Sequence, residues 1–281
     1  MKDFILGFSG CPNDTFIFYA LINNKIDFDL NFKYLVADVE ELNKRVILKD
    51  LDVSKVSFHL FGYMSDEYVI LPSGSALGRG CGPLLISKKQ YSLEELSKKV
   101  IAIPGKWTTA HLLLKLLLPD LEQTQIMYFN EIPDAVASGK VDAGVIIHES
   151  RFTYQKKGLV CISDLGKWWE DTTGSVIPLG GIIAKRDLGT EILTKISNAI
   201  KESIVYAFSH KAECMPFIKR YAQELDDEVI KKHIDLYVND FTIDLGEEGK
   251  KALTMLYNIG HEKGIFPKKI ANDFVFSPFV Q

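Results

Sequence analysis

The sequence predicts a two-lobed α/β protein, and three features of the chain support this prediction. Predicted strands alternate with predicted helices, a pattern typical of a mainly parallel sheet that is covered on both faces. A second α/β series follows the first without a linker rich in Pro, Gly or Ser between them. From Asp187 the pattern changes to helices alone. We therefore interpret the second series as an insertion into the first.

The insertion defines the expected domain boundaries, with the chain crossing near Lys88 and again near Ile182. We expect residues 1–88 and 183–281 to form one lobe with the C-terminal helices, and residues 89–182 to form the other. A chain of 281 residues is long enough for two such units. Ligands of open α/β sheets bind beyond the carboxyl ends of the strands, so we expect the ligand site in the cleft between the lobes.

The first series starts with an apolar run at residues 4–8, which is typical of a buried strand. A turn at residues 10–12 follows, and Asn13 or Asp14 can cap the next helix. The same alternation predicts strands at 31–36 and 51–57, a helix at 38–48 and a short helix from Phe58.

The second series follows a glycine-rich loop at residues 74–82. Ser92 and Glu95 have the spacing of a capping box, and Thr108 can cap a helix that runs to residue 118. The pattern predicts strands at 83–87, 100–104, 125–129 and 141–148 and a helix at 132–138. Apolar residues then recur at helical spacing within 192–208, 230–237 and 252–257.

The composition excludes several classes of protein. Hydrophobic residues make up 47% and charged residues 25% of the chain, which is ordinary for a soluble globular protein. The formal net charge is −4 and no long basic run occurs, so nucleic acid is not an expected partner. The four cysteines lack metal-ligand spacing, so we expect neither a disulfide framework nor a structural zinc site. No apolar stretch approaches the ~20 residues of a membrane-spanning helix, and we expect no membrane partner.

The start of the chain contains a short segment at residues 8–11 that looks like a lipoprotein cleavage box. The apolar run before it covers only residues 4–8, and Asp3 cancels the charge of Lys2. An export signal needs a basic head and an apolar run of about 7–15 residues. We therefore expect a cytoplasmic protein.

Three polar loops follow predicted strands. Residues 103–109 join a strand end to a helix start, where free amides, the helix dipole and the hydroxyls of Thr108 and Thr109 suit a carboxylate or phosphate. A plain helix cap, which needs only one threonine, remains the alternative. The equivalent loops of the first lobe are residues 9–14, with Ser9, Cys11 and Asn13 as candidate cleft-lining residues, and residues 55–57, comprising Lys55, Val56 and Ser57.

His148 lies just past the apolar strand residues 145–147. A histidine at the carboxyl end of a strand can reach the cleft, and its ordinary pKa near 6.5 allows proton exchange at neutral pH. A histidine that is hydrogen-bonded within the core is the alternative. Strand alternation places Glu149 on the opposite face. We interpret the other histidines as structural because they lie in helical patterns: His59, His111, His210, His233 and His261.

Other candidates are weaker. The loop at 78–82 lacks the spacing of a dinucleotide fingerprint and precedes a strand, so it is a turn or hinge loop in which Arg79 could face an anion. Cys11 could be a nucleophile activated by a helix terminus, or simply a small buried residue. Trp168 and Trp169 could form the wall of an aromatic site or pack at its rim. Metal-hydrolase and nucleophile-elbow motifs do not occur in the sequence, and no residue is expected to bind a metal.

Six motifs taken together resemble the 1,4-dihydroxy-6-naphthoate synthase family of the futalosine route to menaquinone. They occur in the family's order between residues 9 and 181, which makes the set far more specific than any one motif. The motifs are SGCPNDT at 9–15, DVSKVS at 52–57, ALGRGCGP at 76–83, PGKWTTA at 104–110, GVIIHE at 144–149 and PLGG at 178–181.

The resemblance implies the two-lobed fold of type II periplasmic binding proteins. It also implies a lyase that cleaves cyclic dehypoxanthinyl futalosine to 1,4-dihydroxy-6-naphthoate and a sugar-derived fragment, without a metal or organic cofactor. The family's proton acceptor corresponds to His148, and its substrate-holding segments correspond to residues 55–57 and to Thr108 with Thr109. A non-catalytic small-anion solute-binding protein and the sister enzyme chorismate dehydratase remain as alternatives. Oligomeric state stays open.

Overall fold

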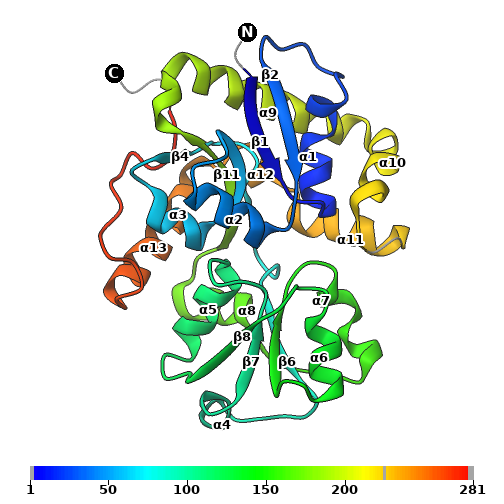
Figure 1. Cartoon of the computed structure of the whole chain (residues 1–281), viewed down its shortest axis with the longest axis vertical. Helices are drawn as coiled ribbons and strands as arrows, with labels where there is room; N and C mark the ends of the chain where they lie inside the picture. The colour runs from blue at the N-terminus through cyan, green and yellow to red at the C-terminus, as the bar shows by residue number, and fades with distance from the viewer. Residues whose placement is uncertain (1–2, 224–225, 278–281) are drawn as a thin grey trace.

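The computed structural model describes residues 3–223 and 226–277, which fold into two lobes (Figure 1). Each lobe is built on its own sheet. The strands of the first lobe are β1 (Asp3–Phe8), β2 (Asn31–Val36), β3 (Val53–Ser57), β4 (Tyr68–Ile70), β5 (Ala76–Gly78) and β11 (Ile177–Lys185). The strands of the second lobe are β6 (Leu84–Ser87), β7 (Val100–Ile103), β8 (Gln123–Ile126), β9 (Ala143–Ile146) and β10 (Val160–Asp164).

Both sheets are mixed, whereas the sequence pattern indicated mainly parallel pairing. The first sheet has the order β2-β1-β3-β11-β4, with β5 paired to β11, and the second has the order β10-β6-β9-β7-β8. Strands that follow one another through a helix pair in parallel, as β1 does with β2 and β3, and β7 with β8 and β9. The two strands next to the crossings, β6 and β11, are antiparallel to their neighbours. The return of the chain between lobes therefore sets the mixed topology.

The chain crosses between the lobes at residues 79–83 and 174–176, earlier than the expected crossings near Lys88 and Ile182. The reason is strand pairing, which places β6 in the second sheet and β11 in the first. At the first crossing a Cβ on Gly82 would lie 2.2 Å from Cα of Gly166, so this close approach requires glycine. The division 1–88, 89–182 and 183–281 thus differs from the sheet boundaries by one strand at each crossing.

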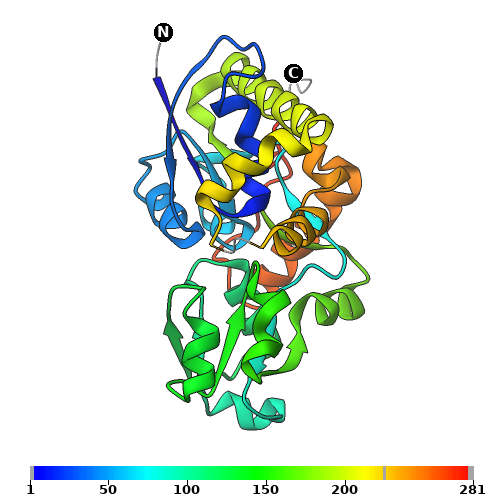
Figure 2. The same cartoon turned by 90° about the vertical axis from the view of Figure 1, so that its right-hand side faces the viewer.

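The helices cover the sheets and gather on the first lobe. Figure 2 shows that the C-terminal helices pack around the first lobe, above the smaller second lobe. The helices of the first lobe are α1 (Pro12–Ile22), α2 (Val39–Ile47), α3 (Phe58–Met64), η2 (Arg186–Leu188), α9 (Gly189–Ser209), α10 (Lys211–Tyr221), α11 (Asp227–Tyr237), α12 (Asp240–Ile243) and α13 (Gly246–Glu262). Those of the second lobe are α4 (Leu93–Ser97), α5 (Thr109–Leu117), α6 (Ile132–Ser138), α7 (Ser150–Thr153), η1 (Tyr154–Lys157) and α8 (Leu165–Thr173).

Local signals in the sequence explain where several helices begin. Asp38 accepts a hydrogen bond from the amide of Glu40 at the start of α2, and the capping box of Ser92 and Glu95 is present in α4. α1 differs from the expectation, because it begins at Pro12, a favoured first helical residue. Asn13 and Asp14 therefore lie inside its first turn, and their side chains make contacts other than a helix cap.

Sequence patterns were least informative for β11 and β8. β11 contains Pro178, Gly180 and Gly181, residues that normally argue against a central strand. A Cβ on Gly180 would lie 2.6 Å from the carbonyl oxygen of Val56, so the close contact with β3 requires this glycine. β8 starts at Gln123, two residues before the expected position, because it pairs with β7 at the exposed edge of the second sheet.

The two lobes share one hydrophobic core. Buried Leu42 and Leu253 of the first lobe belong to the same cluster as buried Leu112 and Leu165 of the second. The amide of Trp107 also donates across the lobes to the carboxylate of Glu40, at 3.1 Å. The lobes are therefore closed against each other. No helix within the described ranges is both long and apolar enough to cross a membrane.

Candidate active site

A cavity of about 90 Å³ lies between the lobes, at the ends of strands from both sheets. Eight of the ten candidate residues from the sequence line this cavity, and only Cys11 and Arg79 do not. The described lining residues are Ser9, Asn13, Asp14, Val39, Lys55, Val56, Ser57, Ala76, Cys81, Pro83, Thr108, Thr109, Ala110, Ile147, His148, Leu179, Gly180 and Tyr237. The loops at residues 55–57 and 108–109 therefore line the same cavity from opposite lobes.

The N-termini of α1 and α5 border this cavity from opposite lobes. Asn13 and Asp14 come from the first turn of α1, and Thr108 to Ala110 form the start of α5. The first amides of a helix have no partners within the helix, and its dipole is positive at this end. Both helices therefore favour negative charge in the cavity, and Asp14 already supplies one such charge at α1.

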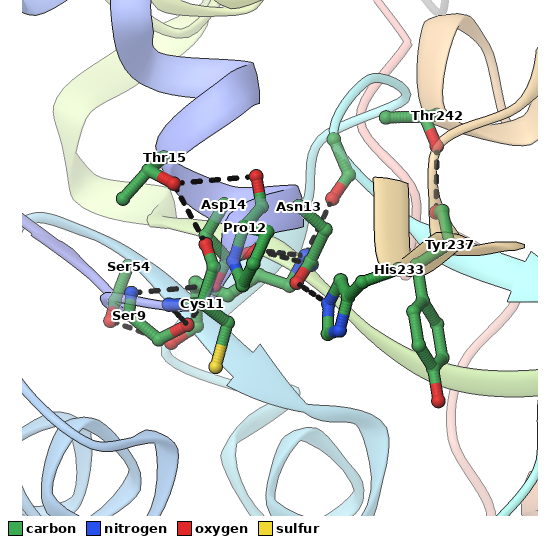
Figure 3. Close-up of polar contacts among 12 residues, drawn as sticks. Ser9, Cys11, Pro12, Asn13, Asp14, Thr15, Ser54, His233, Tyr237 and Thr242 are labelled. Carbon is green, nitrogen blue, oxygen red and sulfur yellow. Dashed lines mark hydrogen bonds and ion pairs between the residues drawn. The ribbon is translucent and has the colours of Figure 1, made fainter. Parts of the chain in front are cut away.

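A buried ion pair between Lys55 and Asp14 forms the first-lobe wall of the cavity, and Figure 3 shows Asp14 beside Ser9 and Asn13. The ammonium of Lys55 lies 2.8 Å from Oδ1 of Asp14 and donates to the carbonyl oxygen of Gly74 at 3.1 Å. The other carboxylate oxygen accepts from the hydroxyl of Ser9 at 2.7 Å, and the amide group of Asn13 donates to Oδ1 at 2.8 Å. These contacts compensate both buried charges, which is the condition for keeping an ion pair out of water.

His148 comes from the second lobe, just after β9. Its backbone has φ of 56°, the left-handed region that side chains other than glycine rarely adopt. The backbone therefore turns at this residue, and strand alternation does not govern Glu149, which instead starts α7 and lines a neighbouring cavity. The imidazole is packed edge-on against Phe129, with ring centroids 5.0 Å apart.

The environment of His148 favours a neutral imidazole with a free lone pair. Burial lowers the pKa of His148 to about 4; the carboxylate of Asp14 opposes this shift and the ammonium of Lys55 adds to it. Its Nε2 atom is buried, and no hydrogen-bond partner reaches it from the described residues. A neutral, unpartnered ring nitrogen beside a cavity is able to accept a proton from a bound molecule.

Thr108 and Thr109 lie at the start of α5, but their hydroxyl groups already have acceptors. The Thr108 hydroxyl donates to the carbonyl oxygen of Gly105 at 2.9 Å, and its oxygen accepts from the amide of His111. The Thr109 hydroxyl donates across the lobes to the carbonyl oxygen of Leu179 at 2.5 Å. The structure thus gives each threonine a local role: Thr108 caps the helix, and Thr109 joins the lobes.

The remaining candidates lie at the margin of the site. Cys11 lines a neighbouring cavity of about 150 Å³, where burial and the carboxylates of Glu149 and Asp14 raise the pKa of its thiol. A raised pKa disfavours the thiolate that a nucleophilic cysteine needs. Arg79 is outside the described lining of the main cavity, is half exposed, and donates to the carbonyl oxygen of Gly174 at the second crossing.

The two tryptophans have different surroundings from those of an aromatic binding wall. Trp169 is buried, belongs to the hydrophobic core and donates to the carbonyl oxygen of Val176 at 3.2 Å. Trp168 packs against the same core. Within residues 3–223 and 226–277, no group of three or more His, Cys, Asp or Glu side chains is arranged to hold a metal ion.

His233 is the main residue near the site that the sequence interpretation missed. It lies on α11, and its Nε2 atom is 2.9 Å from Oδ1 of Asn13 (Figure 3). Its ring stacks on His148, with centroids 5.9 Å apart and planes 19° apart. The sequence placed it on the apolar face of a helix with Ile230 and Ile234. A titratable side chain on a buried face was the one available signal, but nothing local indicated its partners.

Comparisons with known proteins agree with these features. A family model described as menaquinone biosynthesis matches residues 4–262. A Thermus thermophilus protein named 1,4-dihydroxy-6-naphtoate synthase is 43% identical over 265 residues, covering 94% of this chain and 96% of the relative. A Streptomyces coelicolor protein of the same name is 41% identical over 267 residues, covering 93% and 94% of the two chains.

Solved structures show the same fold. Protein AF1704 from Archaeoglobus fulgidus has a TM-score of 0.89 at 35% identity, covering 94% of this chain and 98% of that one. The alkanesulfonate-binding protein SsuA from Xanthomonas axonopodis pv. citri, bound to MOPS, has a TM-score of 0.73 at 12% identity and covers 96% of each chain. These similarities confirm the expected two-lobed fold of periplasmic binding proteins.

Proposed function

The chain belongs to the 1,4-dihydroxy-6-naphthoate synthase family of menaquinone biosynthesis, and we propose that it acts as a carbon–carbon lyase with His148 as the general base. The substrate in this proposal is cyclic dehypoxanthinyl futalosine, and the products are 1,4-dihydroxy-6-naphthoate and a sugar-derived fragment. The observation that carries the proposal is the buried, unpartnered Nε2 of His148 at the cavity between the lobes.

The proposed reaction uses one proton transfer to start bond cleavage. The lone pair on Nε2 of neutral His148 takes a proton from the substrate, and the electron pair left behind drives cleavage of the adjacent carbon–carbon bond. Formation of the aromatic naphthoate makes the cleavage favourable. The proton on His148 then returns to the products, so that the base is regenerated and no net oxidation or reduction takes place.

The substrate's carboxylate is proposed to bind at the start of α5. Thr108, Thr109 and Ala110 line the cavity there, and the free amides of the first turn suit an anion. The loop of Lys55, Val56 and Ser57 faces the same cavity from the first lobe. This placement puts the carboxylate at one end of the cavity and leaves the ring system within reach of His148.

Substrate entry requires the lobes to open. The closed cavity of about 90 Å³ is far smaller than the roughly 300–1,000 Å³ typical of sites for drug-sized ligands. Only the segments at 79–83 and 174–176 connect the sheets within the described chain, so the lobes can move as rigid bodies about them. Closure after binding then excludes water from the reacting atoms.

The test is conversion of cyclic dehypoxanthinyl futalosine by the purified chain, without added metal or organic cofactor, followed by naphthoate fluorescence and mass spectrometry. Formation of the naphthoate with release of the sugar-derived fragment is the expected result. Tight binding of the compound without turnover contradicts the lyase proposal and favours a solute-binding protein. The predicted cytoplasmic location stays a prediction.

A further inference from the structure

We propose that His233 is a positioning residue that holds His148 in its reactive state when the lobes close. This inference deepens the proposed function and rests on His148 being the base. His233 does not line the described cavity wall, so it acts through His148 and not on the substrate.

The histidine pair joins the two lobes. His148 follows β9 in the second sheet, whereas His233 lies on α11 beside the first. Phe129 packs edge-on against the His148 ring at 5.0 Å, and His233 stacks on it at 5.9 Å with planes 19° apart. The base is thus held by one ring of its own lobe and one ring of the other. The contact with His233 exists only when the lobes are closed.

The strained backbone of His148 makes such support necessary. A positive φ in a residue other than glycine persists only where the surroundings over-determine it. The nearly parallel planes of the two imidazoles also identify the type of contact. Nε2 of His148 and Nδ1 of His233 have no hydrogen-bond partner among the described residues, and Nε2 of His233 bonds to Asn13, so the contact is a stacked one and not a proton-transfer hydrogen bond at these atoms.

A chain of hydrogen bonds fixes the protonation state of His233. Lys55 pairs with Asp14, and the Asn13 amide group donates to the Asp14 carboxylate, as Figure 3 shows for the Asn13 end. The Oδ1 atom of Asn13 is therefore directed at His233 as an acceptor, and Nε2 of His233 must donate to it. This assigns the neutral tautomer with the proton on Nε2. Its Nδ1 is buried, and no other described residue bonds to it.

A neutral His233 matters once His148 takes the substrate's proton. The imidazolium of His148 then lies 5.9 Å from a stacked ring that carries no charge, so the new positive charge meets no like charge there. Two imidazolium rings at 5.9 Å would repel each other. Burial, His148 and Lys55 all lower the pKa of His233 well below its ordinary value, which agrees with a ring that stays neutral.

Several titratable groups surround the pair, and all enter any pH measurement. Asp14 and Lys55 act on His148 from α1 and β3, and His233 covers its ring from α11. The other titratable side chains around the cavity are Tyr237 of α11, Cys81 of the first crossing, Cys11 before α1 and Glu149 after the base. The variants below leave all of them unchanged.

Two substitutions of His233 distinguish the effect of its ring from the effect of its hydrogen bond to Asn13. His233→Gln keeps an amide donor for Asn13 but removes the ring face, whereas His233→Phe keeps an apolar ring face but removes the donor. In His233→Gln, water reaches His148 and weakens the effect of burial, so the pKa of His148 rises toward the ordinary ~6.5. We expect turnover near pH 7 to fall about tenfold with KM changed less than about threefold, and the acid limb of kcat to move up by about one pH unit or more.

His233→Phe should preserve the activity and the low pKa of His148 but lower the stability of the protein. We expect kcat within about threefold of the parent and an unmoved acid limb, together with a lower Tm because Asn13 loses its donor. Equal losses in both variants with unmoved acid limbs would mean that His233 only packs the core, and this overturns the proposal. Unchanged kcat and pH profile in His233→Gln overturns it as well.

Nuclear magnetic resonance provides a test that needs neither substrate nor activity. In the parent protein, imidazole ¹⁵N shifts should show His233 as the neutral tautomer with its proton on Nε2 from pH 6 to 8; a charged ring or an Nδ1–H tautomer contradicts the inference. Titration of His148 should shift upward in His233→Gln and stay low in His233→Phe. If His148→Asn retained full activity, the proposed base would fail while this titration still reported whether the pairing exists.

Discussion

The polar groups on the two walls of the cavity differ in whether they have hydrogen-bond partners. On the first-lobe wall, Ser9, Asn13, Asp14 and Lys55 satisfy one another through the ion pair and its hydrogen bonds. On the second-lobe wall, Nε2 of His148 is left without a bond to any described residue. The first wall therefore acts as a fixed electrostatic frame, and the second wall holds the group that can react.

This difference predicts a separation of stability from activity. Removing one member of a compensated buried pair leaves an uncompensated charge, so the cost falls on folding. Removing an unpartnered base leaves nothing else unsatisfied, so the cost falls on turnover. The following substitutions test this separation, in order of expected effect.

His148→Asn should reduce turnover by about 10²–10⁴-fold, the typical contribution of a positioned general base. Asparagine tolerates a positive φ better than most residues, so the backbone at this position should be preserved. Steady-state kinetics and thermal unfolding of the same preparation check the result. Near-parental turnover, or a large loss of Tm with activity per folded molecule intact, would show that His148 is a structural residue.

Asp14→Asn should lower the free energy of unfolding by about 3–5 kcal/mol, because the buried ammonium of Lys55 loses its carboxylate. The matched control is Asp171→Asn, which breaks the exposed ion pair with Lys167 and should cost at most about 0.5 kcal/mol. Urea unfolding of both variants measures the difference. Similar small losses for the two would mean that the first-lobe wall is not a compensated frame.

The pH dependence of turnover should reflect the low pKa of His148. Because burial lowers this pKa to about 4, the base stays neutral as the pH falls from 7 to about 5, and kcat should decline only as the pH approaches 4. An acid limb near pH 6.5 would indicate a solvated imidazole. The comparison requires that ligand remains saturating at each pH.

The same shift affects stability with a definite sign. The unfolded chain binds a proton on residue 148 below about pH 6.5, whereas the folded chain does so only below about 4. The free energy of unfolding should therefore fall as the pH is lowered from 6.5 to 4. His148→Asn should show a shallower fall than its parent, since the other buried histidines are common to both chains. Parallel curves would contradict the low pKa.

The smallest effect concerns the threonines of the second-lobe wall. Replacing Thr108 and Thr109 together with valine removes the cap of α5 and its bond to Leu179, which hold the amides that bind the carboxylate in place. Binding of a naphthoate product analogue should therefore weaken by about tenfold, which corresponds to ~1.4 kcal/mol. The single variants sharpen the result: Thr108→Val removes the helix cap, and Thr109→Val removes the bond to Leu179 between the lobes. Unchanged affinity in a calorimetric titration of the double variant would show that the carboxylate does not bind at the start of α5.

Local patterns in the sequence determined a large part of this protein. Alternating strands and helices, the capping box of Ser92 and Glu95, and the helical spacing from Asp187 onward depend on neighbours within a few residues, so they can be seen in the chain itself. The position of His148 after an apolar strand has the same origin. Its proposed role, however, came from the resemblance of six motifs, because strand-end geometry alone also allowed a structural histidine.

Only the tertiary structure decided how these parts meet. Strand pairing placed β6 and β11 in their sheets, and no local signal specifies a partner strand in a distant part of the chain. His233 and Asn13 are 220 residues apart in sequence, yet their hydrogen bond sets the tautomer that faces His148. The Thr109 hydroxyl likewise bonds to the carbonyl oxygen of Leu179, 70 residues away, whereas the Thr108 hydroxyl bonds locally to Gly105. Hydrogen bonding and burial across the lobes depend on three-dimensional neighbours, which the order of residues does not show.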